Sequence, residues 1–270
     1  MNPTNNAHRK GILHPGIGDT KFSLDRFPPS IETGFFIQNY WIIQWDLRGQ
    51  APYRQTVISH PNVNMVIEKD KTRIYGISSA TYSQLLQDQG WVVGIKFKPG
   101  GFYPFWSAPV SRLTNKSIDV EDVFDVNGLS LSDDILQSQD DIGLAAQRID
   151  SFFRERLPQQ DSNVEYICEL VYRIRDDRSI RQVNDAVRIS GLHQRTLQRL
   201  FDRYVGASPK WVILRYRLHE AVERMSQAGS QDWTGLSHDL GYYDQSHFIR
   251  DFKSIIGLSP EEYLHANVGQ

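Results

Sequence analysis

Between residues 34 and 110, apolar and polar positions alternate in short runs rich in aromatic and β-branched side chains. Such runs are typical of half-buried strands. The clearest is FFIQNYWIIQWDL, residues 35–47, and VNMVIEK, RIYGIS and WVVGIKFK share its character. Turn-forming residues such as Pro99-Gly100-Gly101 separate the runs. This pattern predicts an antiparallel β-rich domain, a barrel or a sandwich, over residues 1–125.

From residue 164 onward the apolar positions follow helical spacing, beginning with VEYICELVYRI. The stretch SIRQ, residues 179–182, has the pattern of a capping box and predicts a helix that starts at Ser179. Gly191 and Gly241 each interrupt a helical pattern that then resumes. The sequence therefore predicts an all-α domain over residues 164–270, and an α+β chain as a whole.

The segment between these two parts, residues 126–163, is expected to be a helical linker. IGLAAQRIDSFFRERL, residues 142–157, has helical apolar spacing, and Pro158 ends it. Its apolar face could pair with a second subunit or pack on its own domain, and the pattern does not distinguish these alternatives.

One motif occurs twice in the helical half. LFDRYVGASP, residues 200–209, and DFKSIIGLSP, residues 251–260, carry Phe, Gly, Ser and Pro at the same four places. A glycine at this position ends a helix, and a following Ser-Pro begins the next one. Each motif follows a helix, a glycine-containing turn and a second helix, so the sequence predicts two helix-turn-helix units.

The second helix of each predicted unit has a polar face that suits a DNA groove. Arg can bind guanine bidentately, Gln can bind adenine, and Ser can bind base edges or phosphate. Ile249 fits either a thymine methyl group or partial burial. The candidate DNA-binding residues are Gln194, Arg195, Gln198 and Arg199 in the first unit, and Gln245, Ser246, Ile249, Arg250 and Lys253 in the second.

Residues 164–270 resemble the DNA-binding domain of AraC/XylS family transcription regulators. GYYDQSHFIRDFKSIIGLSPEEY is very similar to the family's signature stretch, and GLHQRTLQRLFDRYVGASPKW looks like its counterpart in the first repeat. The resemblance implies recognition helices at about 193–204 and 244–255, joined by a long helix over residues 209–225. It implies a sequence-specific regulator that reads two successive major-groove segments of double-stranded DNA, with a homodimer and RNA polymerase as further expected partners.

The N-terminal half carries a less specific resemblance. NYWIIQWDL, SHPNVNMVIEK and GIKFKPGGFYPF are similar to the N-terminal domain of an AraC-type subgroup that has no agreed ligand. The resemblance implies a sensor or dimerisation domain with an unidentified small-molecule effector. A regulator without any small effector is the alternative.

The balance of charges bears on the expected DNA affinity. The chain of 270 residues has 30 Lys and Arg against 32 Asp and Glu. Residues 164–270 hold 14 of each sign, so we expect modest non-specific DNA affinity. The first recognition helix is locally positive through Arg195, Arg199 and Arg203 against Asp202, which predicts that the first unit dominates base reading.

Cysteine content and the lack of targeting segments indicate the compartment. The single cysteine, Cys168, allows no disulfide within the chain. The N-terminus lacks the apolar region of a signal peptide, and no apolar run approaches a membrane span. We therefore expect a cytoplasmic protein that does not engage membranes.

No catalytic motif is present. Histidines before residue 164 are His8, His14 and His60, without the spacing of a metal site. P-loop, G-x-S-x-G and G-x-G-x-x-G motifs are also missing, so we expect no enzyme, no metal and no cofactor. The alternative is an enzyme or ligand-binding protein whose helical half mediates protein contacts. Aromatic side chains could line a ligand pocket or simply form the core or a subunit interface: Phe35, Phe36, Tyr40, Trp41, Trp45, Phe97, Phe102, Phe105 and Trp106.

Overall fold

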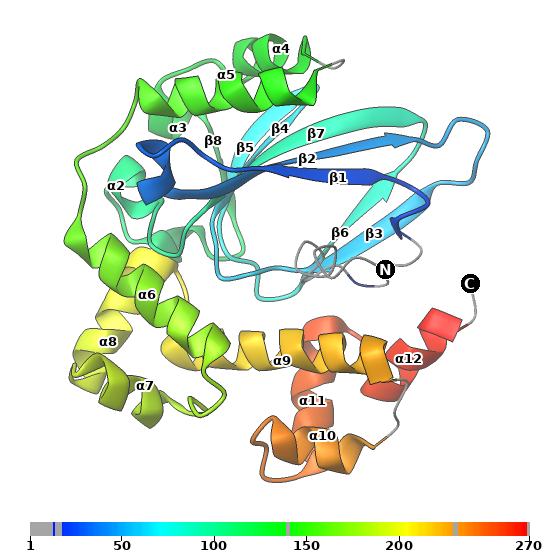
Figure 1. Cartoon of the computed structure of the whole chain (residues 1–270), viewed down its shortest axis with the longest axis vertical. Helices are drawn as coiled ribbons and strands as arrows, with labels where there is room; N and C mark the ends of the chain where they lie inside the picture. Colours follow the sequence, from blue (N-terminus) through cyan, green and yellow to red (C-terminus); the bar gives the residue numbers. More distant parts are fainter. Residues whose placement is uncertain (1–12, 14–17, 139–140, 229–231, 269–270) are drawn as a thin grey trace.

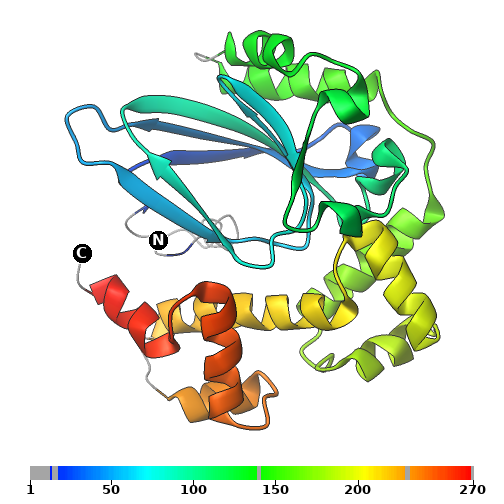
Figure 2. The ribbon, with the colours of Figure 1, turned by 180° about the vertical axis from the view of Figure 1, so that it is seen from behind.

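The computed structural model describes Leu13 and residues 18–138, 141–228 and 232–268. A β-rich N-terminal domain lies above an all-helical C-terminal domain in the view of Figure 1, and Figure 2 shows the same arrangement from behind. The predicted α+β fold class is confirmed.

The N-terminal domain contains two antiparallel sheets. The larger has six strands in the order β1-β2-β7-β4-β5-β8, and the smaller consists of β3 and β6. The strands are β1 Ser23–Phe27, β2 Ile37–Asp46, β3 Tyr53–Ile58, β4 Asn64–Glu68, β5 Lys71–Tyr75, β6 Thr81–Leu86, β7 Gln89–Phe97 and β8 Ser117–Asp119. The four predicted runs form β2, β4, β5 and β7.

One face of the six-stranded sheet is covered by short helices (Figure 1). These are the 3₁₀ turns η3 Thr33–Phe35 and η4 Val110–Leu113, and the helices α2 Tyr103–Trp106, α3 Glu121–Phe124, α4 Gly128–Leu136 and α5 Ile142–Arg154. Ile135 of α4 and Ile149 and Phe153 of α5 are buried in the same core as the sheet residues. The apolar face of α5 therefore packs on its own domain. Residues 155–161 make the passage to the helical half.

The aromatic residues singled out in the sequence divide between the two faces of the sheet. Seven of them belong to the helix-covered core or pack against it: Phe35, Phe36, Tyr40, Phe97, Phe102, Phe105 and Trp106. Trp41 and Trp45 instead line a cavity on the opposite face, between the six-stranded sheet and the β3–β6 ribbon. Most of this aromatic set is therefore core.

The C-terminal domain is built around one long helix, α9 Pro209–Ala228, which runs between two helical groups (Figure 1). The first group is α6 Ser162–Asp176, α7 Val183–Ser190, α8 Gln194–Leu200 and the π-helical turn η5 Phe201–Val205. The second group is α10 Trp233–Asp239, α11 Gln245–Ile256 and α12 Pro260–Val268. The two Ser-Pro pairs begin α9 and α12, as the repeated motif predicts.

The predicted helix start at Ser179 is wrong. Asp177 Oδ1 accepts hydrogen bonds from the Ser179 backbone N–H and hydroxyl, at 2.9 and 2.6 Å, in a turn before the helix. The helix α7 begins at Val183 with Gln182 as N-cap, and Asp185 completes the capping box. Asp185 Oδ2 accepts from the Gln182 backbone N–H at 3.1 Å. A turn between Asp177 and Ser179 thus delays the helix by about one turn.

The two domains share a buried seam along α9. Ile77 of the N-terminal domain is buried in the core of the first helical group, and Ile58 is buried in the core of the second. The fully buried Arg215 of α9 donates from Nη2 to the backbone carbonyls of Ser78 and Ser79, at 2.8 and 2.9 Å. Both helical groups therefore rest on the N-terminal domain.

A histidine pair lies in the same seam. The rings of His60 and His219 stack with their centroids 4.3 Å apart. His219 Nε2 lies 3.5 Å from the carbonyl oxygen of Ser59. This stack ties the segment after β3 to the middle of α9.

Candidate nucleic-acid interface

The first helix-turn-helix unit consists of α7, a turn at Gly191 and the helix α8 with its continuation η5. Gly191 has φ of 66°, a left-handed conformation that favours glycine. Leu197 and Phe201 are buried in the first core, which fixes the inner face of this helix. Gly206 ends it with φ of 88°, and its N–H donates to the Phe201 carbonyl at 2.8 Å.

The four candidate residues of the first unit all lie on the exposed face of α8. Gln194, Arg195, Gln198 and Arg199 are exposed, and no hydrogen bond or ion pair to a described residue holds them. The N-cap residue His193 makes no side-chain capping bond, which leaves the amide groups of the first turn without a cap from this side chain. The exposed face therefore combines two guanidinium groups, two amide side chains and free backbone donors.

The second unit consists of α10, a turn at Gly241 and α11. Gly241 has φ of 76°. Asp244 caps α11 by accepting the His247 backbone N–H at 2.8 Å. Phe248 and Phe252 are buried in the second core, and Gly257 ends the helix with φ of 86°. The repeated motif thus encodes the same helix end twice.

The five candidate residues of the second unit are more engaged with the protein itself. Gln245 Oε1 accepts from the Thr234 hydroxyl at 3.1 Å. Lys253 Nζ lies 3.6 Å from Glu262 Oε2. Ile249 is half-buried against the second core, so packing explains it without a DNA contact. Ser246 and Arg250 are exposed.

Sequence reasoning missed Tyr243, which is 98% exposed at the turn into α11. An exposed ring beside a recognition helix offers a stacking face and a hydroxyl to a sugar or phosphate. The signal was present in the dipeptide Tyr242-Tyr243 just before the N-cap, because Tyr242 is buried and its neighbour then points outward.

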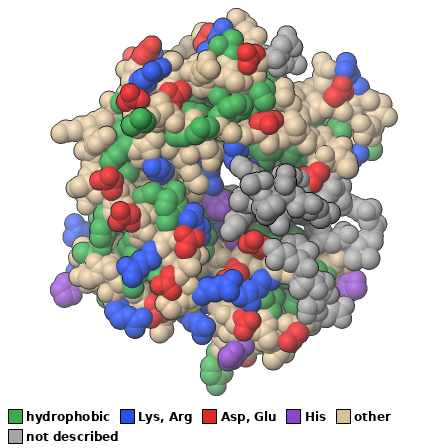
Figure 3. Space-filling model, in the orientation of Figure 1, with side chains coloured by type: hydrophobic (Ala, Val, Ile, Leu, Met, Phe, Trp, Pro, Cys, Tyr) green, Lys and Arg blue, Asp and Glu red, His purple; other side chains and the backbone are tan. Residues whose placement is uncertain are grey.

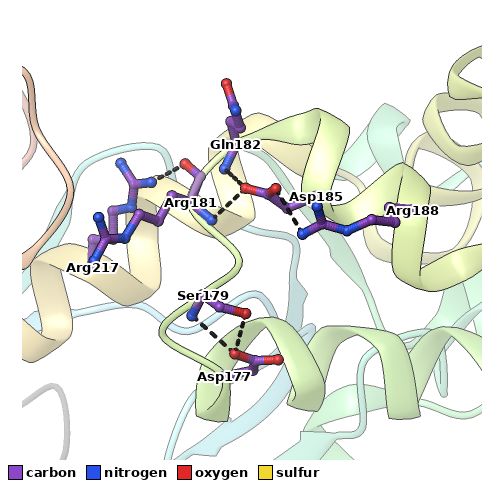
Figure 4. A network of polar contacts seen from close by, with 7 residues as sticks. All are labelled: Asp177, Ser179, Arg181, Gln182, Asp185, Arg188 and Arg217. Atoms are coloured by element: carbon purple, nitrogen blue, oxygen red, sulfur yellow. Dashed lines mark hydrogen bonds and ion pairs between the residues drawn. The ribbon is translucent and has the colours of Figure 1, made fainter.

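A polar network joins the segment before α7 to α9 (Figure 4), and the second unit contacts residues of the same network. Arg217 of α9 donates to the backbone carbonyl of Arg181, just before α7, and its guanidinium lies 5.7 Å from the Tyr242 ring centroid in the second unit. A Cβ at Gly241 would stand 2.6 Å from Arg181 Cδ, so the two units touch here. Burial lowers the pKa of Arg217, and Tyr242 raises it in opposition. The residues drawn in Figure 4 are Asp177, Ser179, Arg181, Gln182, Asp185, Arg188 and Arg217.

The charges around these helices are mixed. Figure 3 shows acidic and basic side chains interspersed over one face of the molecule. Many arginines are paired: Arg224 contacts Glu220 and Asp239, and Arg178 also contacts Glu220. Because the electrostatic attraction to phosphate is limited, a few placed contacts would have to supply most of the affinity.

Other kinds of site find little support in the part of the chain that the structure describes. No group of three His, Cys, Asp or Glu side chains there is arranged to hold a metal ion. None of the described helices combines the length and apolar character needed to cross a membrane. His8 and His14 lie outside the described residues, and His60 stacks on His219.

Two helix-turn-helix units joined by one long helix, beside a β-rich domain, define a two-domain helix-turn-helix protein. Residues 186–266 match the family model described as "Helix-turn-helix domain", and residues 25–119 match "Domain of unknown function (DUF6597)". The helix-turn-helix match spans both repeated motifs, as the sequence predicts for this half of the chain.

The individual relatives are distant. An "Uncharacterized HTH-type transcriptional regulator" of Haemophilus influenzae is 31% identical over 65 residues, which are 24% of this chain and 22% of that protein. The matched part thus spans about a fifth of that relative's length.

Two solved structures are similar in outline. ToxT from Vibrio cholerae O395 has 15% identity and a TM-score of 0.39, covering 93% of this chain and 95% of that one. Unsaturated fatty acid bound ToxT from strain SCE256 has 14% identity and a TM-score of 0.39, covering 90% and 91%.

Proposed function

We propose that the chain is a sequence-specific transcription regulator that binds double-stranded DNA in the cytoplasm. In this proposal α8 and α11 enter two successive major-groove segments. The observation that carries it is the pair of helix-turn-helix units at the two ends of α9, each with an exposed polar helix face. Arg195, Gln198 and Arg199 would read bases in the first segment, and Ser246 and Arg250 would read bases or hold phosphates in the second.

The length of α9 supports this reading. A helix of 20 residues is about 30 Å long. One turn of DNA, which separates successive major-groove segments on one face, is about 34 Å. A single helix of this length can therefore place two units at neighbouring groove segments, and the contacts of Arg217 hold their relative orientation.

The N-terminal domain would control DNA binding through a small ligand, through homodimerisation, or through both. Support comes from the shared seam, because any change in the segments after β3 and β5 acts directly on α9. Contact with RNA polymerase is part of the same proposal and would use surfaces outside α8 and α11. The competing function, a ligand-binding protein whose helical half contacts only proteins, predicts no saturable DNA binding.

The test is selection of bound genomic fragments with the full-length chain, followed by affinity measurements over a salt series. We expect a compact site read in two segments about 10 bp apart. The double variant Arg195→Ala/Arg199→Ala should lose the preference for this site. Binding that is weak at all sites and indifferent to these substitutions would refute the proposal.

A matched control removes two positive charges elsewhere. Arg48 and Arg54 are exposed on the N-terminal domain, so Arg48→Ala/Arg54→Ala changes the net charge equally. If both double variants weaken binding to the same extent, the effect is one of overall charge, and α8 has no special role.

A further inference from the structure

The β-rich domain forms a half-open cavity of about 1200 Å³ between the helix-free face of the six-stranded sheet and the β3–β6 ribbon. Ligand pockets usually measure about 300–1,000 Å³, so the space is ample for a small molecule. Alternate residues of three adjacent strands point into it: Leu24 and Arg26 of β1, Asn39, Trp41, Ile43 and Trp45 of β2, and Gly90, Val92 and Lys96 of β7.

Two indole rings form the floor of the cavity. Trp41 lies opposite Gly94, and Trp45 lies opposite Gly90, in the antiparallel register of β2 and β7. A Cβ at Gly94 would stand 1.9 Å from the Trp41 ring, and one at Gly90 would stand 2.5 Å from the Trp45 ring. Both rings therefore pack closely against the backbone of β7, and both line the cavity.

One end of the cavity is cationic. Asn39, Lys96 and Asn64 form a row across β2, β7 and β4, and Arg26 lies diagonally next to this row on β1. Arg26 Nη1 and Asn39 Oδ1 are buried without a hydrogen-bond partner among the described residues. Lys96 has no ion pair or hydrogen bond to any described residue.

The ammonium group of Lys96 is held in an unfavourable setting. Its pKa is lowered to about 7, chiefly by burial and also by the nearby charges of Arg26 and Arg175. The acidic residues that line the cavity are Glu68 at the end of β4, Asp70 in the turn after it and Asp133 of α4. Asp133 belongs to the same end, because its neighbour Ser132 donates to the carbonyls of Glu68 and Lys69. Glu68 lies four positions further along β4 than Asn64, a distance of about 13 Å. The two cations thus face the cavity without a nearby carboxylate.

We propose that this cavity binds an aromatic carboxylate, with the carboxylate group between Lys96 and Arg26 and the ring over Trp41 and Trp45. A carboxylate offers two acceptor oxygens, which match an ammonium and a guanidinium group that converge on one place. Stacking on indole faces selects a planar apolar body. The carboxylate would accept hydrogen bonds from Arg26 Nη1 and Lys96 Nζ, and so would balance the positive charge and satisfy the donors at this end.

The cavity wall is also the domain seam. Ser59, His60 and Ser78 line the cavity, and the same three residues contact α9 through His219 and Arg215. A ligand that shifts this wall would act on the helix that joins the two helix-turn-helix units. This second part rests on the proposed function, whereas ligand binding itself does not.

The test uses the full-length chain and biphenyl-4-carboxylate, with biphenyl-4-carboxamide as the neutral isostere. Titration is followed by calorimetry and by tryptophan fluorescence, because Trp41 and Trp45 line the cavity. We expect saturable binding of the acid with a change in fluorescence, and at least tenfold weaker binding of the amide. Equal binding of acid and amide, or no binding of the acid, would overturn the proposal.

Lys96→Met removes the charge and keeps the length of the side chain, and we expect at least tenfold weaker binding of the acid. Arg26→Met serves as the second variant, should the first fail to fold. Lys71→Met is the matched control, because Lys71 lines the other end of the same cavity. If Lys71→Met weakens binding and Lys96→Met does not, the carboxylate lies elsewhere and the assignment is wrong.

DNA affinity is then measured with and without saturating acid. A change of affinity supports the coupling through α9. If the acid binds and DNA affinity stays constant, the coupling is refuted and the binding site stands. If the chain binds no DNA, the proposed function fails, and the ligand titration still reports on the cavity.

Discussion

Arg215 is the most deeply buried charged residue of the seam, and replacing it tests how the two domains hold together. Its side chain is fully buried, and it stacks on Trp211 with the guanidinium 4.4 Å from the ring centroid. Burial lowers its pKa from 12.5 to about 10, which corresponds to a cost of about 3 kcal/mol for keeping the charge at neutral pH. Against this cost stand the two hydrogen bonds to the carbonyls of Ser78 and Ser79.

Hydrogen bonds from a charged donor contribute about 1.5–3 kcal/mol each, so the pair is worth about 3–6 kcal/mol. The difference leaves a net stabilisation between about 0 and 3 kcal/mol. Met keeps the unbranched stem of the side chain, so Arg215→Met should lower the free energy of unfolding by about 1 kcal/mol and by less than about 3. This expected loss is smaller than the cost of about 3–5 kcal/mol for breaking a buried ion pair.

Urea denaturation of the full-length chain, followed by circular dichroism, measures this change. Arg217→Met is the control, because Arg217 lies two positions further along α9 and contacts the helical units instead of the β-rich domain. Hydrogen exchange should report faster exchange around Ser78 and Ser79 only for Arg215→Met. A loss above about 4 kcal/mol, or equal exchange in both variants, would refute this account of the seam.

Three further outcomes are expected. Arg199→Ala should weaken binding to the selected DNA site more than Arg250→Ala, because the first recognition helix carries more unpaired positive charge; gel-shift titration would contradict this if Arg250→Ala proved the more damaging. Gly94→Ala should lower stability by about 1–3 kcal/mol through overpacking against the facing indole ring, whereas Gly34→Ala, where a Cβ meets nothing closer than 3.5 Å, should have little effect in the same urea assay. The free energy of unfolding should rise by up to about 1.4 kcal/mol per pH unit between pH 7 and 10, because in this range Lys96 is protonated in the unfolded chain and deprotonated in the folded one. Urea titrations at several pH values measure this slope, and the Lys96→Met variant should lack it.

The helical half was predictable because its signals are local. Gly206 and Gly257 adopt the left-handed conformation that the repeated motif requires, and the two Ser-Pro pairs begin α9 and α12. The start of α7 could not be predicted in the same way. Ser179 and Asp185 both offer a capping pattern, and the turn at Asp177 decides between them. Two capping patterns compete here, and the hydrogen bonds from Ser179 to Asp177, two residues earlier, decide where the helix begins.

The cavity could not be predicted from the sequence, although the strands that supply its lining residues could. The run WVVGIKFK indicates a strand, and strand alternation places Lys96 on the face opposite Ile95. Which face meets the helices depends on the pairing of β7 with β2 and β4, and on the position of β3 and β6, which no local pattern marked. The aromatic residues were divided between core and cavity by the same register.

Each hydrophobic core of the helical half is finished by a side chain from the β-rich half. Ile77, 1% exposed, closes the first core, and Ile58, 1% exposed, closes the second. Fully burying such a side chain contributes about 1.5–3 kcal/mol. A truncated fragment that begins at residue 164 would expose to water the two places in its cores that Ile77 and Ile58 fill. Low solubility of such a fragment would therefore result from these missing contacts and would not mean that the fragment cannot fold. For the intact chain, the same feature predicts that heat unfolds both halves in one cooperative step.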